Sequence, residues 1–382
     1  MKKPAVVFIF SFLWLFGVSQ STVVDSIYSG GIYRNYRLYI PAAYNGLSAR
    51  PLILNLHGYT SNASQQQLYS NFMPIADTAN FLMVYPNGTL LSGQPFWNAG
   101  ISSTLVNDIN FLSNLMDSLR TQYNIDVNSI YSTGMSNGGF MSHTLACELS
   151  HRIAAIASVT GSIFNTQYGS LCHPSRPVPV MQIHGTSDPT VPYAGNSAQA
   201  MMPIDSVVNY WVTKNGCNPI PFFAAIPNSN TSDGCTAEHY VYSGGYSGSS
   251  VELYKIIGGT HTWPGFPLGG VGTNLDINAS KEIWRFFRQY KLNQLTSVNE
   301  INQQSLHFLM YPNPAQTILH VEMDILSDAL IEYQLYNVLG EIVLSEETAR
   351  QQINMTDLPS GMYTLQVLQN HQALVKAKLV KE

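Results

Sequence analysis

Residues 131–141 read YSTGMSNGGFM and contain one Gly-x-Ser-x-Gly pattern, with Ser136 at its centre. The preceding residues 129–133 predict a short β-strand, and residues 140–149 predict a helix with one apolar face. A strand, a tight turn of small residues and a helix hold a serine in a sharp elbow with its hydroxyl exposed, which is the setting of a nucleophile. The pattern alone also fits a glycine-rich turn with a solvated serine. The strand and the helix around it favour the nucleophile.

The chain on both sides of this elbow alternates between apolar runs and amphipathic stretches. We expect strands at residues 34–40, 51–56, 81–85, 154–159, 178–183 and 252–257, the first of them as an edge strand, and helices at residues 107–123, 205–214 and 279–290. Such alternation predicts an α/β fold, a mostly parallel sheet with helices on both faces. In sheets of this kind, ligands bind at the carboxyl ends of the strands.

The loop at residues 57–60, HGYT, follows one of these buried strands. In a hydrolase of this fold, one oxyanion donor is the backbone N–H after the nucleophile, and a second comes from a loop in this position. We therefore expect the N–H groups of Asn137 and Tyr59 to form an oxyanion hole, with Thr60 as the alternative to Tyr59. A plain strand-ending turn is the other interpretation.

Two later loops carry a candidate acid and a candidate base. Asp188 follows the strand at residues 178–183 in a loop with two prolines, and the acid of a triad must be held in place to orient an imidazole. An aspartate before proline is also common in ordinary turns. After Asp188, His261 alone among the histidines lies in a glycine-flanked loop directly behind a predicted core strand. The order serine, acid, histidine then predicts a triad of Ser136, Asp188 and His261.

The chemistry of such a triad is acyl transfer. Ser136 attacks an ester carbonyl while His261 takes its proton, and Asp188 stabilises the imidazolium. Each backbone donor to the oxyanion contributes on the order of 3 kcal/mol. Water then hydrolyses the acyl-enzyme with His261 as the base. This reaction needs no metal and no organic cofactor.

Four motifs resemble the polyhydroxybutyrate depolymerase and feruloyl esterase group of α/β-hydrolases over about residues 25–290. They are LHG at 56–58, GMSNGG at 134–139, HGTSD at 184–188 and GTHTWPG at 259–265. The resemblance implies the same triad and a secreted esterase. The segments 96–98, FWN, and 107–108, ND, match stretches that the group also keeps near its site. We expect Trp97 and Trp263 either to wall a site for an aromatic or sugar group or to pack in the core.

The first twenty residues predict a secretory signal. Two lysines precede an apolar run at residues 5–18, which small polar residues follow; this order is typical of a cleavable signal. An uncleaved membrane anchor is the alternative. In an exported chain the four cysteines predict disulfides, since none are spaced as in a zinc site. Three connectivities are open, and we favour the local pairs Cys147–Cys172 and Cys217–Cys235, each worth roughly 3 kcal/mol.

The tail after residue 290 changes character. Residues 291–304 are polar and predict a linker, whereas residues 305–382 alternate apolar and polar side chains, which predicts a small β-sandwich of about seven strands. The motifs YPNP at 311–314, YNVLG at 336–340 and LPSGMY at 358–363 resemble the C-terminal sorting domain of the type IX secretion system. The resemblance implies that this machinery exports the chain through the periplasm and across an outer membrane. A carbohydrate-binding module is the rival interpretation, for which the tyrosines are few.

The whole chain therefore predicts a signal peptide at 1–20, an α/β-hydrolase domain at 21–290, a linker at 291–304 and a sorting domain at 305–382. A net charge of −5 without a basic stripe argues against nucleic acid as a partner. The predicted function is a secreted or cell-surface serine esterase acting on feruloyl or acetyl esters of plant cell-wall polysaccharide. A depolymerase of polyhydroxybutyrate, a short-chain polyester, is the alternative; a non-catalytic surface binding protein and a peptidase are the rivals from other classes.

Overall fold

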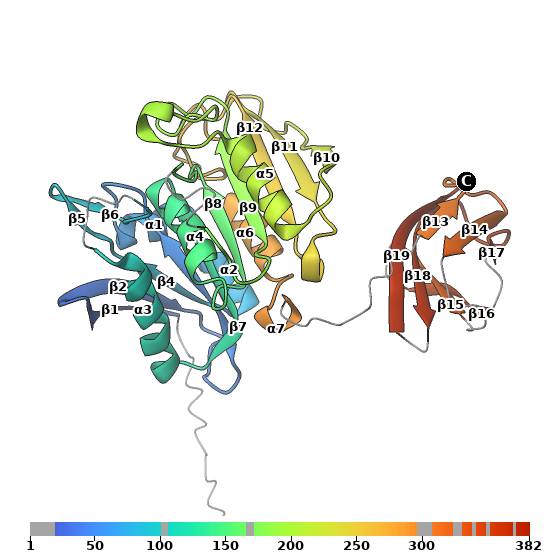
Figure 1. The fold of residues 1–382 in the computed structure, drawn as a ribbon, viewed down its shortest axis with the longest axis horizontal. Coiled ribbons are helices and arrows are strands. Elements are labelled where there is room, and N and C mark those ends of the chain that lie inside the picture. Colours follow the sequence, from blue (N-terminus) through green and yellow to red (C-terminus); the bar gives the residue numbers. More distant parts are fainter. Residues whose placement is uncertain are drawn as a thin grey trace, which may run out of the picture. The chain divides into compact units, whose positions relative to one another are not determined.

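The computed structural model describes residues 20–100, 106–165, 172–295, 308–323, 331–337, 341–348, 352–369 and 372–382. The chain divides into two compact units, Met1–Val298 and Asn299–Glu382 (Figure 1). Apart from Gln20, the predicted signal peptide lies outside the described residues, and so does the predicted linker beyond residue 295. No helix among the described residues is both long and apolar enough to span a bilayer.

The first unit is built on a ten-stranded sheet. Across the sheet the order is β1 (Ser21–Ser29), β2 (Ile32–Ile40), β4 (Leu82–Pro86), β3 (Arg50–Leu56), β7 (Ile125–Met135), β8 (Ala155–Val159), β9 (Val180–Gly185), β12 (Val251–Ile257), β11 (Thr236–Tyr242) and β10 (Phe222–Ala225). The strands from β4 to β12 in this order run parallel, and antiparallel strands flank them on both sides. The central strands are almost continuously buried, as parallel strands covered on both faces must be.

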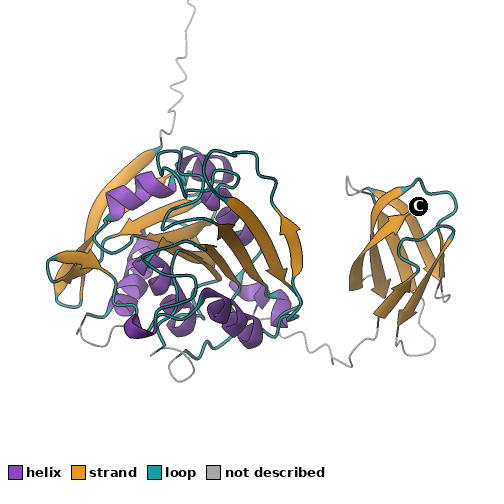
Figure 2. Cartoon of the chain, turned by 90° about the horizontal axis from the view of Figure 1, so that it is seen from above, coloured by secondary structure: helices purple, strands orange, loops and turns teal. Residues whose placement is uncertain are grey.

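Helices cover both faces of this sheet (Figure 2). The core on one face includes α3 (Asp108–Gln122), α4 (Asn137–Glu148) and α5 (Ile204–Asn215). The core on the other includes α2 (Met73–Ala79) and α6 (Ala279–Phe287), with α1 (Ala63–Ser70) contributing Ala63. In α3 the side chain of Asn107 caps the first turn, and the apolar residues at helical spacing are buried. The α/β prediction is confirmed.

Several elements differ from the sequence-based expectation. The strand expected at the sheet edge, residues 34–40, belongs to β2. It is not the edge strand, because β1 (Ser21–Ser29) pairs with its outer side. The stretch around His239 forms β11, which pairs with β12. Short elements complete the unit: β5 (Thr89–Leu91), β6 (Gln94–Phe96), α7 (Leu292–Leu295) and two 3₁₀ turns, Ser197–Gln199 and Tyr246–Gly248.

The second unit contains a three-stranded and a four-stranded sheet. The first consists of β13 (Phe308–Tyr311), β14 (Ile318–Met323) and β17 (Gln352–Asn354). The second consists of β16 (Ile342–Thr348), β15 (Ile331–Tyr336), β18 (Gly361–Gln369) and β19 (Gln372–Lys381). Buried side chains of both sheets, among them Leu319 and Leu365, form one core. Two sheets over a shared core make the small all-β sandwich that the period-two pattern predicts.

One of the two predicted disulfides is present. Cys147 and Cys172 are bonded, with a Cα–Cα distance of 4.8 Å, whereas Cys217 and Cys235 are free, buried thiols. The prediction of a Cys217–Cys235 bond is wrong for a topological reason. Cys217 lies beside Ser249 at the start of β12, while Cys235 precedes β11, whose first residue pairs with Ile257 at the end of β12. A strand of this length separates the thiols by roughly 20 Å, and they also belong to cores on opposite faces.

Candidate active site

Ser136 lies at the tip of the turn between β7 and α4. Its backbone has φ 54° and ψ −120°, a conformation that residues with a Cβ rarely adopt. The Ser136 N–H donates to Val159 O at 2.8 Å, and Ser136 O accepts from Phe140 N at 3.0 Å, so both sides of the turn are fixed. This is the strained strand–turn–helix elbow that the sequence predicts for a nucleophile.

The two glycines of the motif permit the close packing of this elbow. A Cβ added to Gly138 would lie 2.1 Å from the carbonyl oxygen of Leu56 at the end of β3. A Cβ on Gly134 would lie 2.5 Å from the backbone of Gly138. The glycines therefore bring α4 against β3 and place the loop after β3 beside Ser136.

Asp188 and His261 form a directly bonded pair. His261 Nδ1 lies 2.7 Å from Asp188 Oδ2, and the Asp188 carboxylate is fully buried while His261 is 19 % exposed. The other carboxylate oxygen accepts from the N–H groups of Thr190 at 2.8 Å and Val191 at 2.9 Å. A carboxylate can only accept, so His261 carries its proton on Nδ1 and leaves Nε2 free to act as a base.

The electrostatics of the pair favour a charged acid. Burial raises the pKa of Asp188, but the hydrogen bond and charge of His261 and the Val191 N–H outweigh it, so that the pKa lies below its ordinary value. A carboxylate that stays ionised can stabilise an imidazolium when His261 takes up a proton.

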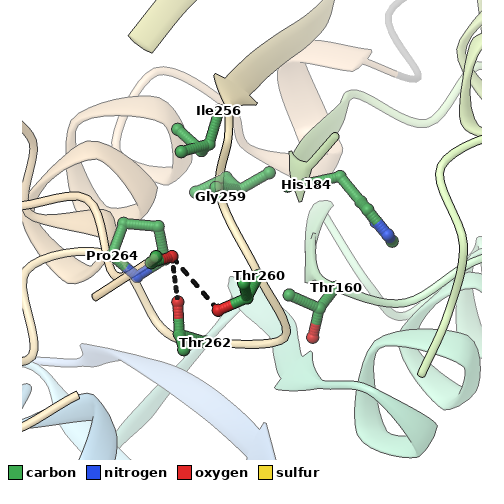
Figure 3. Close-up of a pocket in the computed structure, with 10 residues that line it drawn as sticks. Thr160, His184, Ile256, Gly259, Thr260, Thr262 and Pro264 are labelled. Atoms are coloured by element: carbon green, nitrogen blue, oxygen red, sulfur yellow. Dashed lines mark hydrogen bonds between the residues drawn. The ribbon is translucent and has the colours of Figure 1, made fainter. Parts of the chain in front are cut away.

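The loops of the acid and the base are tied to each other. Thr186 N donates to Ile256 O at 2.8 Å, Ser187 N to Gly259 O at 2.9 Å, and Gly258 N to the Thr186 hydroxyl at 2.9 Å. A narrow pocket, too small to hold a water molecule, is lined by Thr160, His184, Thr260 and neighbours. There the hydroxyls of Thr260 and Thr262 converge on the Gly272 carbonyl (Figure 3).

The predicted oxyanion donors lie around Ser136. Asn137 is the first residue of α4, where the N–H has no partner within the helix and the helix dipole is positive. A Cβ on Gly58 would lie 3.4 Å from Ser136 Cβ, so the HGYT loop abuts the nucleophile. Thr60 N donates to Pro95 O at 2.9 Å, whereas within the described part of the chain no acceptor is recorded for Tyr59 N. The N–H of Thr60, the alternative donor, is therefore already bonded, and Tyr59 stays the predicted second donor.

Comparison with solved structures places this arrangement in a known fold. An acetyl xylan esterase from Aspergillus awamori superimposes with a TM-score of 0.50 at 15% sequence identity, over 70% of this chain and 99% of that one. Residues 44–214 match the phospholipase/carboxylesterase family. The first unit, the hydrolase domain, has the α/β-hydrolase fold. Residues 309–382 match the secretion system C-terminal sorting domain, as the three tail motifs predict.

Relatives known by sequence match within the hydrolase domain. Feruloyl esterase B of Piromyces equi is 29% identical over 229 residues, which are 58% of this chain and 41% of that protein. A bifunctional acetylxylan esterase/xylanase of Neocallimastix patriciarum is 31% identical over 173 residues, 45% of this chain and 24% of that protein. Feruloyl esterase C of Emericella nidulans is 26% identical over 245 residues, 61% of this chain and 83% of that protein. The chain thus spans less than half the length of the first two.

The sheet brings Ser136, Asp188 and His261 to one end of the hydrolase domain, since β7, β9 and β12 are parallel and each residue follows one of them. Among the described residues no hydrogen bond is recorded between Ser136 and His261. Catalytic hydrogen bonds are often long before substrate binds.

The described residues also contain no cluster of His, Cys, Asp and Glu arranged to hold a metal ion.

The structure contradicts a substrate-binding role for Trp97 and Trp263. Their exposed fractions are 0% and 1%, so neither ring can wall an open site. The Trp97 indole stacks on Phe111 and donates to His57 O at 3.0 Å. The Trp263 indole donates to Ser280 Oγ at 3.0 Å. Core packing, the alternative interpretation, holds for both.

Two side chains around the HGYT loop make contacts that the sequence does not predict. His57 Nε2 accepts from Gly88 N at 2.9 Å, so its Nδ1 carries the proton and donates to Gly58 O at 2.7 Å. Burial lowers the pKa of His57 to about 4, which keeps the ring neutral. The Asn137 side chain accepts from Trp97 N at 2.6 Å and donates to Trp97 O at 3.0 Å. The side chains of His57 and Asn137 thus fix the loops beside Ser136. In the sequence, only their positions within the HG and GxSxG motifs suggest such a role.

Proposed function

We propose that the hydrolase domain is a serine carboxylic-ester hydrolase that works through an acyl-enzyme on Ser136. The observation that carries the proposal is the 2.7 Å contact between Asp188 and His261 at the same end of the sheet as the strained Ser136 elbow. A buried acid bonded to a half-buried imidazole, beside a serine on a tight turn, matches the roles of a catalytic triad.

The proposed reaction begins when Nε2 of His261 removes the proton from the Ser136 hydroxyl as its oxygen attacks the ester carbonyl. Asp188 stabilises the imidazolium and holds it in one orientation. The N–H groups of Asn137 and Tyr59 donate to the tetrahedral oxyanion. The imidazolium protonates the departing alcohol, and His261 then activates water, which releases the acid and restores Ser136.

The proposed substrates are feruloyl or acetyl esters of plant cell-wall polysaccharide, with feruloyl esters slightly favoured. The relatives named as feruloyl and acetylxylan esterases support this class. A short-chain polyester such as polyhydroxybutyrate is the alternative, since the same catalytic core can serve both. The sorting domain match supports export of the enzyme by the type IX machinery to the cell surface or beyond.

A substrate panel with the purified chain tests the proposal. It compares p-nitrophenyl acetate, p-nitrophenyl butyrate, methyl ferulate, acetylated xylan and a polyhydroxybutyrate suspension, with Ser136→Ala beside the native protein. Ser118→Ala, on α3, serves as a control that removes a hydroxyl elsewhere. Turnover of methyl ferulate or acetylated xylan that only Ser136→Ala abolishes supports the wall-polysaccharide esterase.

Other outcomes would redirect the proposal. Clearing of the polyester with little ferulate release would make the protein a depolymerase. If no ester is hydrolysed in a Ser136-dependent manner and a fluorophosphonate leaves Ser136 unlabelled, the domain is a binding protein and the enzymatic proposal is wrong.

A further inference from the structure

Behind Asp188 a buried row of polar side chains connects three elements of the hydrolase domain. Trp211 Nε1 on α5 lies 3.1 Å from His143 Nδ1 on α4. His143 Nε2 lies 3.1 Å from Gln182 Oε1 on β9, and Gln182 Nε2 lies 3.2 Å from His184 Nδ1 on the same strand. Exposed fractions are 0% or 1% for all four side chains. The proposed reaction does not use any of them.

The direction of every hydrogen bond in this row is fixed by groups that can act in only one way. An indole N–H can only donate, so His143 accepts at Nδ1 and donates from Nε2 to Gln182 Oε1. Gln182 Nε2 also donates to the carbonyl of Gly161 at 2.8 Å, which independently sets the orientation of this amide. His184 therefore accepts at Nδ1 and carries its proton on Nε2.

The row ends at the loop of the catalytic acid. His184 Nε2 donates to Val191 O at 2.8 Å, and Val191 N donates to Asp188 Oδ1 at 2.9 Å. His184 Nε2 is also 3.5 Å from Asp188 Oδ2, too far for a good hydrogen bond but close enough for the positive end of its N–H dipole to face the carboxylate. Figure 3 shows the His184 ring turned away from Thr260 and Gly259.

The two histidines of this row are uncharged, although the Asp188 carboxylate lies beside His184. Burial lowers the pKa of His143 and of His184 to about 4 each, so both rings are neutral at neutral pH. Tyr193 packs edge-on against His184 and donates to Asp205 at 2.6 Å. The row therefore supplies oriented dipoles and fixed hydrogen bonds to the acid loop rather than a charge.

We propose that this row positions the acid of the triad, and that His184 is its key positioning residue. His184 holds the Val191 carbonyl, and with it the Asp188 loop, in the orientation in which Asp188 bonds His261. Because His143 lies on the helix that begins at the nucleophile, the row also couples the acid loop to the Ser136 elbow. This inference rests on the proposed function of the domain.

The test replaces His184 by Phe in the full chain, which keeps a ring and deletes the donor. Two quantities are measured: the strongly deshielded proton shared by His261 Nδ1 and Asp188 in the proton NMR spectrum, and kcat and KM for p-nitrophenyl acetate. We expect the deshielded signal to broaden or vanish and kcat to fall about tenfold, the effect of losing roughly one hydrogen bond, with KM nearly unchanged. His184→Gln, whose amide can still donate to Val191 O, restores most of both.

A matched control deletes another buried donor. Tyr210→Phe, next to Trp211 on α5, removes a hydroxyl that donates to Cys172 O at 2.9 Å and should alter thermal stability without changing the proton signal or kcat. If His184→Phe does not fold, the same two quantities are measured on Gln182→Met, which removes the donor to His184 Nδ1.

A folded variant of either kind with unchanged signal and kcat overturns the inference. A wild type without Ser136-dependent turnover instead defeats the proposed function. In that case the deshielded signal alone still decides whether His184 holds the Asp188–His261 pair.

Discussion

At the residue scale, Ser136 holds a backbone conformation that costs about 1–3 kcal/mol. The φ of 54° and ψ of −120° persist because hydrogen bonds to Val159 and Phe140 fix both sides of the turn. In the strand–turn–helix elbow of hydrolases, a strained backbone of this kind exposes the serine hydroxyl at the end of the sheet. The strain is therefore part of the site.

Asp188→Asn tests the role of the acid with almost no change in shape. An amide at this position can present its N–H₂ to His261 Nδ1 and so stabilise the wrong tautomer, with the proton on Nε2. We expect kcat for p-nitrophenyl acetate to fall by about 10⁴, while KM changes little. Asp205→Asn, which alters the exposed partner of Tyr193, is the matched control and should leave kcat as it is. A fall of less than about tenfold would show that Asp188 is not the acid.

Which site residues are predictable from the sequence depends on whether their role is local. Ser136, Asp188 and His261 each follow a buried strand, so chain order and strand pattern suffice to predict that they lie at the same end of the sheet. The burial of Trp97 and Trp263 depends on partners such as Phe111 and Ser280, far along the chain. Local patterns carry no such information, so they leave open the choice between a wall of the site and core packing.

At the element scale, the site depends on how closely α4 crosses β3. Gly138→Ala would place a methyl group 2.1 Å from the Leu56 carbonyl oxygen. That oxygen belongs to the backbone and the methyl carbon is bonded directly to the backbone of α4, so neither can move alone. We expect a loss of more than about 3 kcal/mol in the free energy of unfolding, measured by urea denaturation. Gly30→Ala is the control: its φ is +63° but nothing lies within 4 Å, so it should cost only about 1 kcal/mol. Equal losses would contradict the close-packing argument.

The sequence predicts the central elements of the sheet better than its edges. Parallel strands buried on both faces are continuous apolar runs, and α3 shows its buried side chains at helical spacing. Strands β1 and β10 have mostly exposed side chains, and the apolar run of β10 is only four residues long. The Cys217–Cys235 prediction failed for a related reason, since proximity in sequence says nothing of which face of the sheet a residue joins.

At the scale of the whole molecule, buried histidines make the stability of the hydrolase domain depend on pH. The pKa values of His57, His143 and His184 are each lowered to about 4, against an ordinary value of about 6.5. Between these values the unfolded chain binds protons that the folded chain does not. Stability should therefore be complete above about pH 6.5 and fall as the pH drops toward 4, by up to about 4 kcal/mol per pH unit for three such groups.

Denaturation in urea at pH 7, 6 and 5 measures this slope. His184→Gln removes one of the three histidines and should reduce the slope by roughly a third, up to about 1.4 kcal/mol per pH unit. A free energy of unfolding that stays constant over this range would mean that the buried rings gain protons in the folded state.

The two units of the chain have separate cores. Among the residues that the structure describes, the two cores of the hydrolase domain include none after Leu292, and that of the sorting domain includes none before Met310. A unit with its own core can fold alone, so a chain ending at residue 298 should hydrolyse p-nitrophenyl acetate with a kcat within about twofold of the full chain. Expressed in a host with the type IX machinery, it should remain inside the cell. Full-length Ser136→Ala should show the opposite combination, export without activity. Loss of activity on truncation would show instead that residues 299–382 stabilise the hydrolase fold, because the truncation removes no part of the proposed triad.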